Sequence, residues 1–193
     1  ANFANTVTVT AISLDNNTGT TGATFSGTAK TITGTINGAA AGEGTIVVSG
    51  TPTFVSTIGN TYRPAQLTIN GATTFQAAVQ TTLLTTTAAI SNGTTLNVSG
   101  ASSIGANITT SGTQTYSDTV TLSGGDRTLT GSTITTNGTI VGGGNSLTIT
   151  GNAVFGDGTA DTVTGVNILS VSDNTTIHTD TITTTGTQTY GDD

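Results

Sequence analysis

The chain has 193 residues, of which 33% are hydrophobic and only 7% are charged, and its formal net charge is −7. Three cations against ten acids would repel a phosphate backbone, so we expect no nucleic-acid partner. The absence of Cys excludes disulfides and thiolate metal sites. No apolar run approaches the roughly 20 residues that a bilayer requires, so we also expect no membrane-spanning segment.

Small hydroxyl residues dominate the composition, with 52 Thr and 15 Ser beside 27 Gly. Thr favours strands because its branched Cβ fits a pleated surface, and Gly supplies the positive φ of tight turns. A chain of this kind, with few charged residues and without Cys or Met, is typical of secreted bacterial surface proteins. We therefore expect an extracellular or cell-surface location.

Alternation of apolar and hydroxyl residues with a period of two predicts short strands along most of the chain. The clearest cases are residues 6–14, 31–36, 119–124, 146–151 and 168–173. Residues 73–90 place some apolar side chains near helical spacing, but five Thr between 81 and 87 disfavour a helix. We expect strand or irregular structure there, with a short helix as the minority alternative.

A short motif of apolar, any, apolar, small polar and Gly recurs along the chain. It ends at Gly50, Gly71, Gly100, Gly124 and Gly151, and a degenerate copy ends at Asp173. The copies are irregularly spaced at intervals of about 20 to 30 residues, which lie within the range of solenoid repeats. The motif therefore indicates a repetitive β-structure.

In the last third of the chain the spacing becomes regular. Leu129, Ile149 and Leu169 are equally spaced, and the same interval separates Ile134 from Val154. Such spacing would stack like side chains in successive turns of a coil, so we predict an all-β fold, a parallel β-helix (β-solenoid) with turns of about 20 residues. Asn-Gly and Asp-Gly turn signals between apolar runs leave an antiparallel β-sandwich or jelly roll as the alternative.

A longer repeat lies inside the second half. Residues 96–118 match residues 169–192 at an offset of 73 that becomes 74, and eight of the last ten positions are identical. The first copy leads into the strand predicted at 119–124, whereas the second does not. We expect the missing strand to come from continuation of a longer repeat chain or from self-association. We divide the chain into 1–93, an irregular β region that caps or begins the solenoid, and 94–193, the β-strand repeat region that contains this long repeat.

Residues suited to catalysis are sparse. His178 is the only histidine and lies in a pattern typical of an outward strand position, so we expect no catalytic residues and no enzymatic activity. Asp157 and Asp161 form the best candidate for a metal site, because two carboxylates and nearby carbonyls suit calcium. The spacing around two Gly is also that of a plain turn, and we expect no other cofactor.

The Thr-x-Thr pairs raise ice binding as a further possibility, since ranks of Thr can face an ice lattice. Their number is 18, close to what this Thr content would give by chance, and no strict repeat keeps them in register. The five Phe and three Tyr are too few to line a carbohydrate cleft, and we expect the Phe to fill the core.

The runs SGTQTYSDTVTLSGGDRTLTG (111–131) and SLTITGNAVFGDGTADTVTG (146–165) resemble the repeats of large bacterial surface proteins. These are filamentous-haemagglutinin-like exoproteins, autotransporter passengers and related β-strand-repeat adhesins. The resemblance covers mainly residues 94–193. It implies a β-solenoid or stacked-β stalk at the cell surface that serves adhesion or forms an extracellular layer, with a host or surface receptor as a possible partner.

We therefore expect an extracellular structural or adhesive protein that forms a rigid stalk or layer without catalysis. One alternative is a self-assembling filament, S-layer or pilus-like subunit completed by strand exchange between neighbours. The other is a β-solenoid that binds a ligand such as ice or a glycan.

Overall fold

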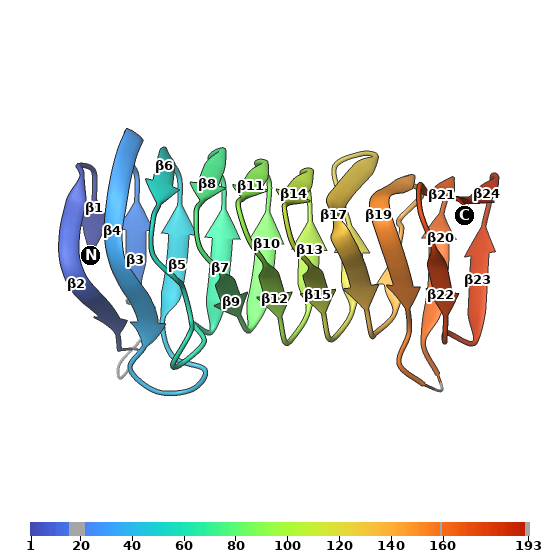
Figure 1. Ribbon diagram of the computed structural model, residues 1–193, viewed down its shortest axis with the longest axis horizontal. Coiled ribbons are helices and arrows are strands. Elements are labelled where there is room, and N and C mark those ends of the chain that lie inside the picture. The colour runs from blue at the N-terminus through green and yellow to red at the C-terminus, as the bar shows by residue number, and fades with distance from the viewer. Residues whose placement is uncertain (16–21, 159, 192–193) are drawn as a thin grey trace.

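The computed structural model describes residues 1–15, 22–158 and 160–191, and 24 strands lie within them. The strands form an elongated solenoid whose termini lie at opposite ends (Figure 1). None of the described residues is helical, and all strand pairings are parallel. The predicted β-solenoid is confirmed, and the antiparallel sandwich is wrong because that fold requires antiparallel neighbours.

One sheet runs the whole length of the solenoid, and we call it face 1. Its ten strands are, in spatial order, β1 (Asn2–Phe3), β3 (Ala23–Phe25), β5 (Thr45–Val48), β7 (Gln66–Ile69), β10 (Leu83–Thr86), β13 (Ser102–Ile104), β16 (Val120–Leu122), β18 (Ile140–Val141), β20 (Thr162–Val166) and β23 (Thr181–Thr184). Ten stacked strands correspond to nine full turns. Leu84, for example, lies between Leu67 and Ser102 of the neighbouring coils, so the coil length is close to the predicted value of about 20 residues.

The second sheet has 14 strands and bends into two further faces. Four long strands cross the bend and belong to both: β2 (Val7–Leu14), β4 (Thr28–Gly38), β17 (Arg127–Thr136) and β19 (Leu147–Phe155). Face 2 also contains β6 (Thr51–Phe54), β8 (Thr73–Phe75), β11 (Ile90–Asn92), β14 (Ile108–Thr110), β21 (Leu169–Val171) and β24 (Gln188–Tyr190). Face 3 also contains β9 (Val79–Thr81), β12 (Leu96–Val98), β15 (Gln114–Tyr116) and β22 (Thr175–Ile177).

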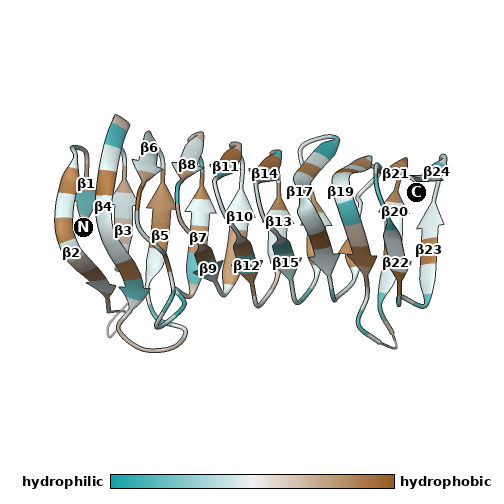
Figure 2. Cartoon of the chain, viewed as in Figure 1, coloured by the Kyte–Doolittle hydropathy of each residue, from teal (hydrophilic) through white to brown (hydrophobic). Residues whose placement is uncertain are grey.

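The hydrophobic core fills the space between the three faces. Alternate residues of each strand point inward, and apolar residues recur in every coil (Figure 2). Phe25, Phe54 and Phe75 are fully buried and contact one another in series. The rings of Phe25 and Phe54 meet edge to face with centroids 5.0 Å apart, and those of Phe54 and Phe75 stack with centroids 5.1 Å apart. The predicted core role of these phenylalanines is confirmed.

The segment with the ambiguous pattern, 73–90, is entirely non-helical. It contains β8, β9 and β10 and ends at the first residue of β11. The strand interpretation is therefore confirmed. Both sheets continue across residue 93, because β11 pairs with β8 on one side and with β14 on the other, and β10 pairs with β13.

The stacking differs in detail from the spacing expected in the last third. Leu129 lies beside Ile149 as predicted, but Ile149 lies beside Val171 rather than Leu169. Ile134 pairs with Ala153, so its predicted pairing with Val154 is also wrong. The physical reason for the second error is a bulge, since β17 carries one more residue than β19 where the two strands turn from face 2 to face 3.

The sequence unit that repeats is one side of the coil rather than the whole coil. From Leu84 to Val120 an inward residue recurs at every sixth position, once in each strand, so three sides make one coil. The two long-repeat copies accordingly lie on different faces. Residues 114–116 form β15 on face 3, whereas the matching residues 188–190 form β24 on face 2.

Candidate functional surface

The predicted metal residues Asp157 and Asp161 lie in one turn between β19 and β20. The backbone N–H of Asp157 donates a 3.3 Å hydrogen bond to Oδ2 of Asp161. A third acid, Asp180, joins this region, because its Oδ2 accepts a 2.9 Å hydrogen bond from the N–H of Ala160. The carboxylates of Asp161 and Asp180 thus act as acceptors for turn amides. The described residues contain no group of three or more His, Cys, Asp or Glu side chains that could hold a metal ion.

Two further polar side chains, those of His178 and Arg127, lie outside the apolar core. His178 is exposed directly after β22, as expected of an outward position. The Nε of Arg127 donates hydrogen bonds of 3.0 and 3.1 Å to the carbonyls of Ser123 and Gly125. The guanidinium therefore closes the turn before β17 rather than forming a binding site.

A buried polar cluster interrupts the apolar core near the middle of the solenoid. The Tyr116 hydroxyl donates a 2.7 Å hydrogen bond to Oε1 of Gln114, and both side chains are fully buried. Burial raises the pKa of Tyr116, so its hydroxyl stays protonated at neutral pH. Because these groups are shielded from solvent, the cluster stabilises the interior rather than presenting reactive atoms.

The feature with the most regular geometry is a hydroxyl array on the outer side of face 2. Its first column pairs Thr74, Ser91, Thr109, Thr130 and Thr150 in successive coils. Its second column pairs Thr128, Thr148, Ser170 and Thr189. Neighbouring coils are about 4.8 Å apart, which is the spacing of paired strands. The two columns are about 6.6 Å apart, because their positions lie two residues apart along a strand.

The hydroxyl array faces solvent with its hydroxyl groups free. All nine residues are exposed or half-buried, and none of their hydroxyls hydrogen-bonds within the described part of the chain. Neither column contains a charged residue. The surface therefore offers a regular pattern of methyl and hydroxyl groups without an electrostatic target.

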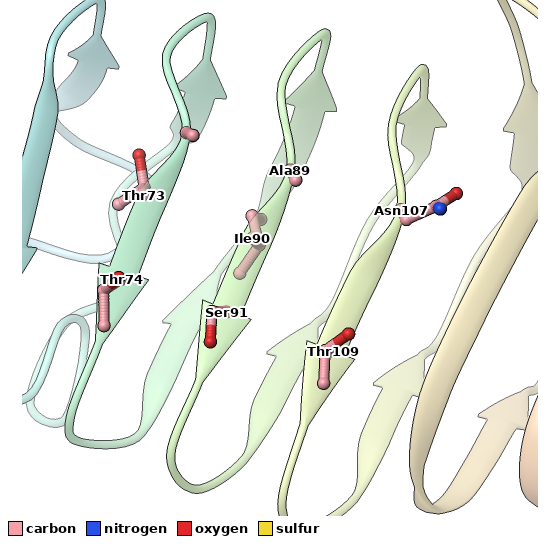
Figure 3. A pocket seen from close by; sticks show the side chains of 8 residues that line it. Thr73, Thr74, Ala89, Ile90, Ser91, Asn107 and Thr109 are labelled. Carbon is pink, nitrogen blue, oxygen red and sulfur yellow. The ribbon is translucent and has the colours of Figure 1, made fainter.

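Small side chains leave a pocket on the outer side of face 2, beside the first column. Ala72 and Ala89 occupy the positions that Thr128 and Thr148 hold further along, and an open pocket lies between β8, β11 and β14 (Figure 3). Thr74, Ser91 and Thr109 line it from three neighbouring strands. The described residues that line this pocket are neither charged nor aromatic, and its polar groups are hydroxyls and the amide of Asn107.

Sequence reasoning missed the register of these hydroxyls. One Thr-x-Thr pair is in register with another, because Thr128 and Thr130 lie directly beside Thr148 and Thr150. The detectable signal was the recurrence of TLT at 128–130 as TIT at 148–150, at the same interval that relates Leu129 to Ile149. Earlier coils differ in length, which hid the alignment of Thr109 with Thr130.

A search of the described residues for membrane-spanning helices finds none of sufficient length and apolarity. Comparison of the chain with protein-family models, with curated proteins and with solved structures found no match.

Proposed function

We propose that the chain is a non-catalytic structural element, a rigid rod of an extracellular or cell-surface protein that spaces or displays other surfaces. The observation that carries this proposal is the continuity of the parallel ladders. Face 1 is unbroken from β1 to β23, and face 2 continues to β24 in the last coil. Each coil is hydrogen-bonded to its neighbours, so bending the rod would strain many bonds at once.

The composition supports this setting. A surface of Thr and Ser with few charges is tolerant of salt and offers few Lys or Arg sites for trypsin-like proteases. The resemblance of residues 111–131 and 146–165 to bacterial surface repeats favours an adhesive stalk or layer.

Two measurements test the proposal. Antibody against the folded chain should label intact native cells as strongly as permeabilised ones; labelling that requires permeabilisation would overturn the extracellular role. Pulled from its two ends, a single molecule should hold its length and then release coils in steps of about 20 residues. Smooth lengthening at low force would contradict a load-bearing rod.

The hydroxyl array favours a second candidate, binding to ice. Methyl and hydroxyl groups in two aligned columns can hold water in an ordered layer, and neither column contains a charged residue that would disturb that layer. This candidate predicts that the protein slows ice recrystallisation. Thr148→Lys on face 2 should abolish the effect, whereas Thr135→Lys on face 3 should retain it. Ice growth unchanged by the wild-type protein would exclude this function.

A further inference from the structure

The outer side of face 1 carries a column of uncharged residues that runs through eight neighbouring strands, from β3 to β20 (Figure 1). Each member lies directly beside the next across a strand pairing. In order along the rod the members are Thr24, Val47, Thr68, Thr85, Ser103, Thr121, Val141 and Thr164. All of them are exposed or half-buried, so their side chains point away from the core.

This column has the same order of residue types from either end. Thr85 and Ser103 are its two middle members. Val47 and Val141 are its only apolar members, and each lies two coils from the middle pair. Hydroxyl residues occupy every other position on both sides. A surface that pairs with its own copy about a two-fold axis requires such an order, because residue i then meets residue j and j meets i.

The neighbouring outward position places a large side chain beside a small one at the same middle. Leu83 is 40% exposed on β10. Ala101 holds the equivalent position in the next coil, because Leu84 pairs with Ser102. An open pocket lies beside Leu83, and Ala101 and Ser103 are among its lining residues. A projecting apolar side chain and a hollow therefore lie on opposite sides of the line between β10 and β13.

The corners that lead into face 1 carry opposite charges at equal distances from this line. Arg63 precedes β7 and Asp118 precedes β16, and these two strands flank β10 and β13. Nε of Arg63 donates a 3.3 Å hydrogen bond to Gln80, and Oδ1 of the exposed Asp118 accepts one of 2.6 Å from the N–H of Thr119. When two copies pair about this line, the corner with Arg63 in each meets the corner with Asp118 in the other, so unlike charges adjoin twice.

We propose that the outer side of face 1 binds a second copy of this chain, with the two rods side by side and pointing in opposite directions. The two-fold axis runs along the strands, midway between β10 and β13. Leu83 of each copy then enters the pocket beside Ala101 of the other, and Val47 of each lies against Val141 of the other. The strands of the two sheets are aligned, as in a β-sandwich, and the sheets lie about 10 Å apart.

The size of this contact predicts a reversible dimer. Eight strands about 4.8 Å apart and a contact about 10 Å wide give about 400 Å² per copy, against about 800 Å² per partner in stable complexes. The column contains no charged residue, so two chains of net charge −7 can meet here without placing like charges in contact. We therefore expect the monomer at low protein concentration and the dimer at high concentration.

Sedimentation velocity of the full chain over a concentration series tests the contact. Leu83→Ala removes the projecting side chain and Ala101→Leu fills the hollow, so each should weaken the dimer at least about tenfold. The double variant Leu83→Ala with Ala101→Leu should restore it, because the two-fold axis exchanges the two positions. Thr109→Leu places the same side chain on face 2 and should dimerise like wild type.

The chain contains no Cys, so single Cys variants test the direction of the rods. An equimolar mixture of Val47→Cys and Val141→Cys should be joined by a thiol crosslinker that spans about 10 Å, the distance between packed sheets. Neither variant alone should be joined, because two copies of the same residue lie five coils, about 24 Å, apart along the rods.

Three results would overturn the inference. The first is wild-type protein that stays monomeric at every concentration. The second is a dimer that Ala101→Leu leaves unchanged or that the double variant fails to restore. The third is crosslinking of Val47→Cys to itself, since the rods would then point in the same direction.

Discussion

Tyr116 and Gln114 are joined by a 2.7 Å hydrogen bond inside the core, and the equivalent Tyr190 and Gln188 are joined by a 2.8 Å bond at the exposed end. Because the same Tyr–Gln hydrogen bond occurs in a buried and in an exposed setting, comparing the two shows how much burial adds to its contribution to stability. In the core, loss of the hydroxyl leaves Oε1 of Gln114 without its partner and without water. At the end, solvent can replace it.

Tyr116→Phe should therefore lower the free energy of unfolding by about 1–3 kcal/mol, the cost of an unsatisfied buried acceptor. Tyr190→Phe is the matched control and should change it by less than about 0.5 kcal/mol, as surface substitutions usually do. Urea unfolding followed by circular dichroism measures both. Equal losses in the two variants would show that burial does not set the strength of this cluster.

Alkaline pH should destabilise the fold through Tyr116. Burial raises the pKa of Tyr116 above the ordinary value of 10.0, whereas the unfolded chain titrates near that value. The folded state thus holds the proton more tightly, and its stabilising contribution is complete below about pH 10 and lost as the pH rises further. Thermal midpoints of wild type should fall above pH 10 more steeply than those of Tyr116→Phe; parallel curves would contradict this assignment.

Ser102 marks a weak point in the core. Its side chain is only 3% exposed, its Oγ has no hydrogen-bond partner among the described residues, and it lies between Leu84 and Val120 in the column of face 1. Ser102→Val removes the unpaired hydroxyl and adds apolar volume, so we expect a gain of about 1–2 kcal/mol in unfolding free energy. Ser103→Val on the outer side is the control and should be nearly neutral. A less stable Ser102→Val variant would show that the column has no room for the added methyl groups.

Gly151 is fixed by close approach of two backbones. Its φ is +127°, and a Cβ there would overlap the carbonyl oxygen of Gly131 in the neighbouring coil. Gly151→Ala should cost at least about 1–3 kcal/mol through strain and should separate β17 from β19. At Gly158 a Cβ would meet nothing within 4 Å, so Gly158→Ala should leave the midpoint of thermal unfolding unchanged. Similar midpoints for both variants would overturn this explanation.

The sequence predicted the fold class because alternation and repetition are local properties. It did not predict the stacking, because that depends on residues added at corners, such as the bulge between Thr130 and Thr133. The short motif follows strands of face 1 at Gly50 and Gly71 but a strand of face 3 at Gly100, which explains its irregular intervals. The hydroxyl array was hidden for the same reason, since its alignment follows from coil length and not from any single segment.

Each coil in this part of the solenoid consists of three similar sides, one on each face. Ser102 and Val120 are directly paired on face 1, so deletion of residues 102–119 removes one whole coil and leaves each later strand on its own face. The chain should still fold and should shorten by about 4.8 Å, the spacing of neighbouring strands.

Deletion of residues 102–107 is the sharper control, because it removes fewer residues but should do more damage. It moves every later strand by one face, and the bulged corner of β17 no longer lies between face 2 and face 3. We expect a lower urea midpoint and loss of hydrogen-exchange protection in β17 and β19, whereas the longer deletion retains both. If the shorter deletion were tolerated equally well, the three faces would be interchangeable and the corners would not fix the register.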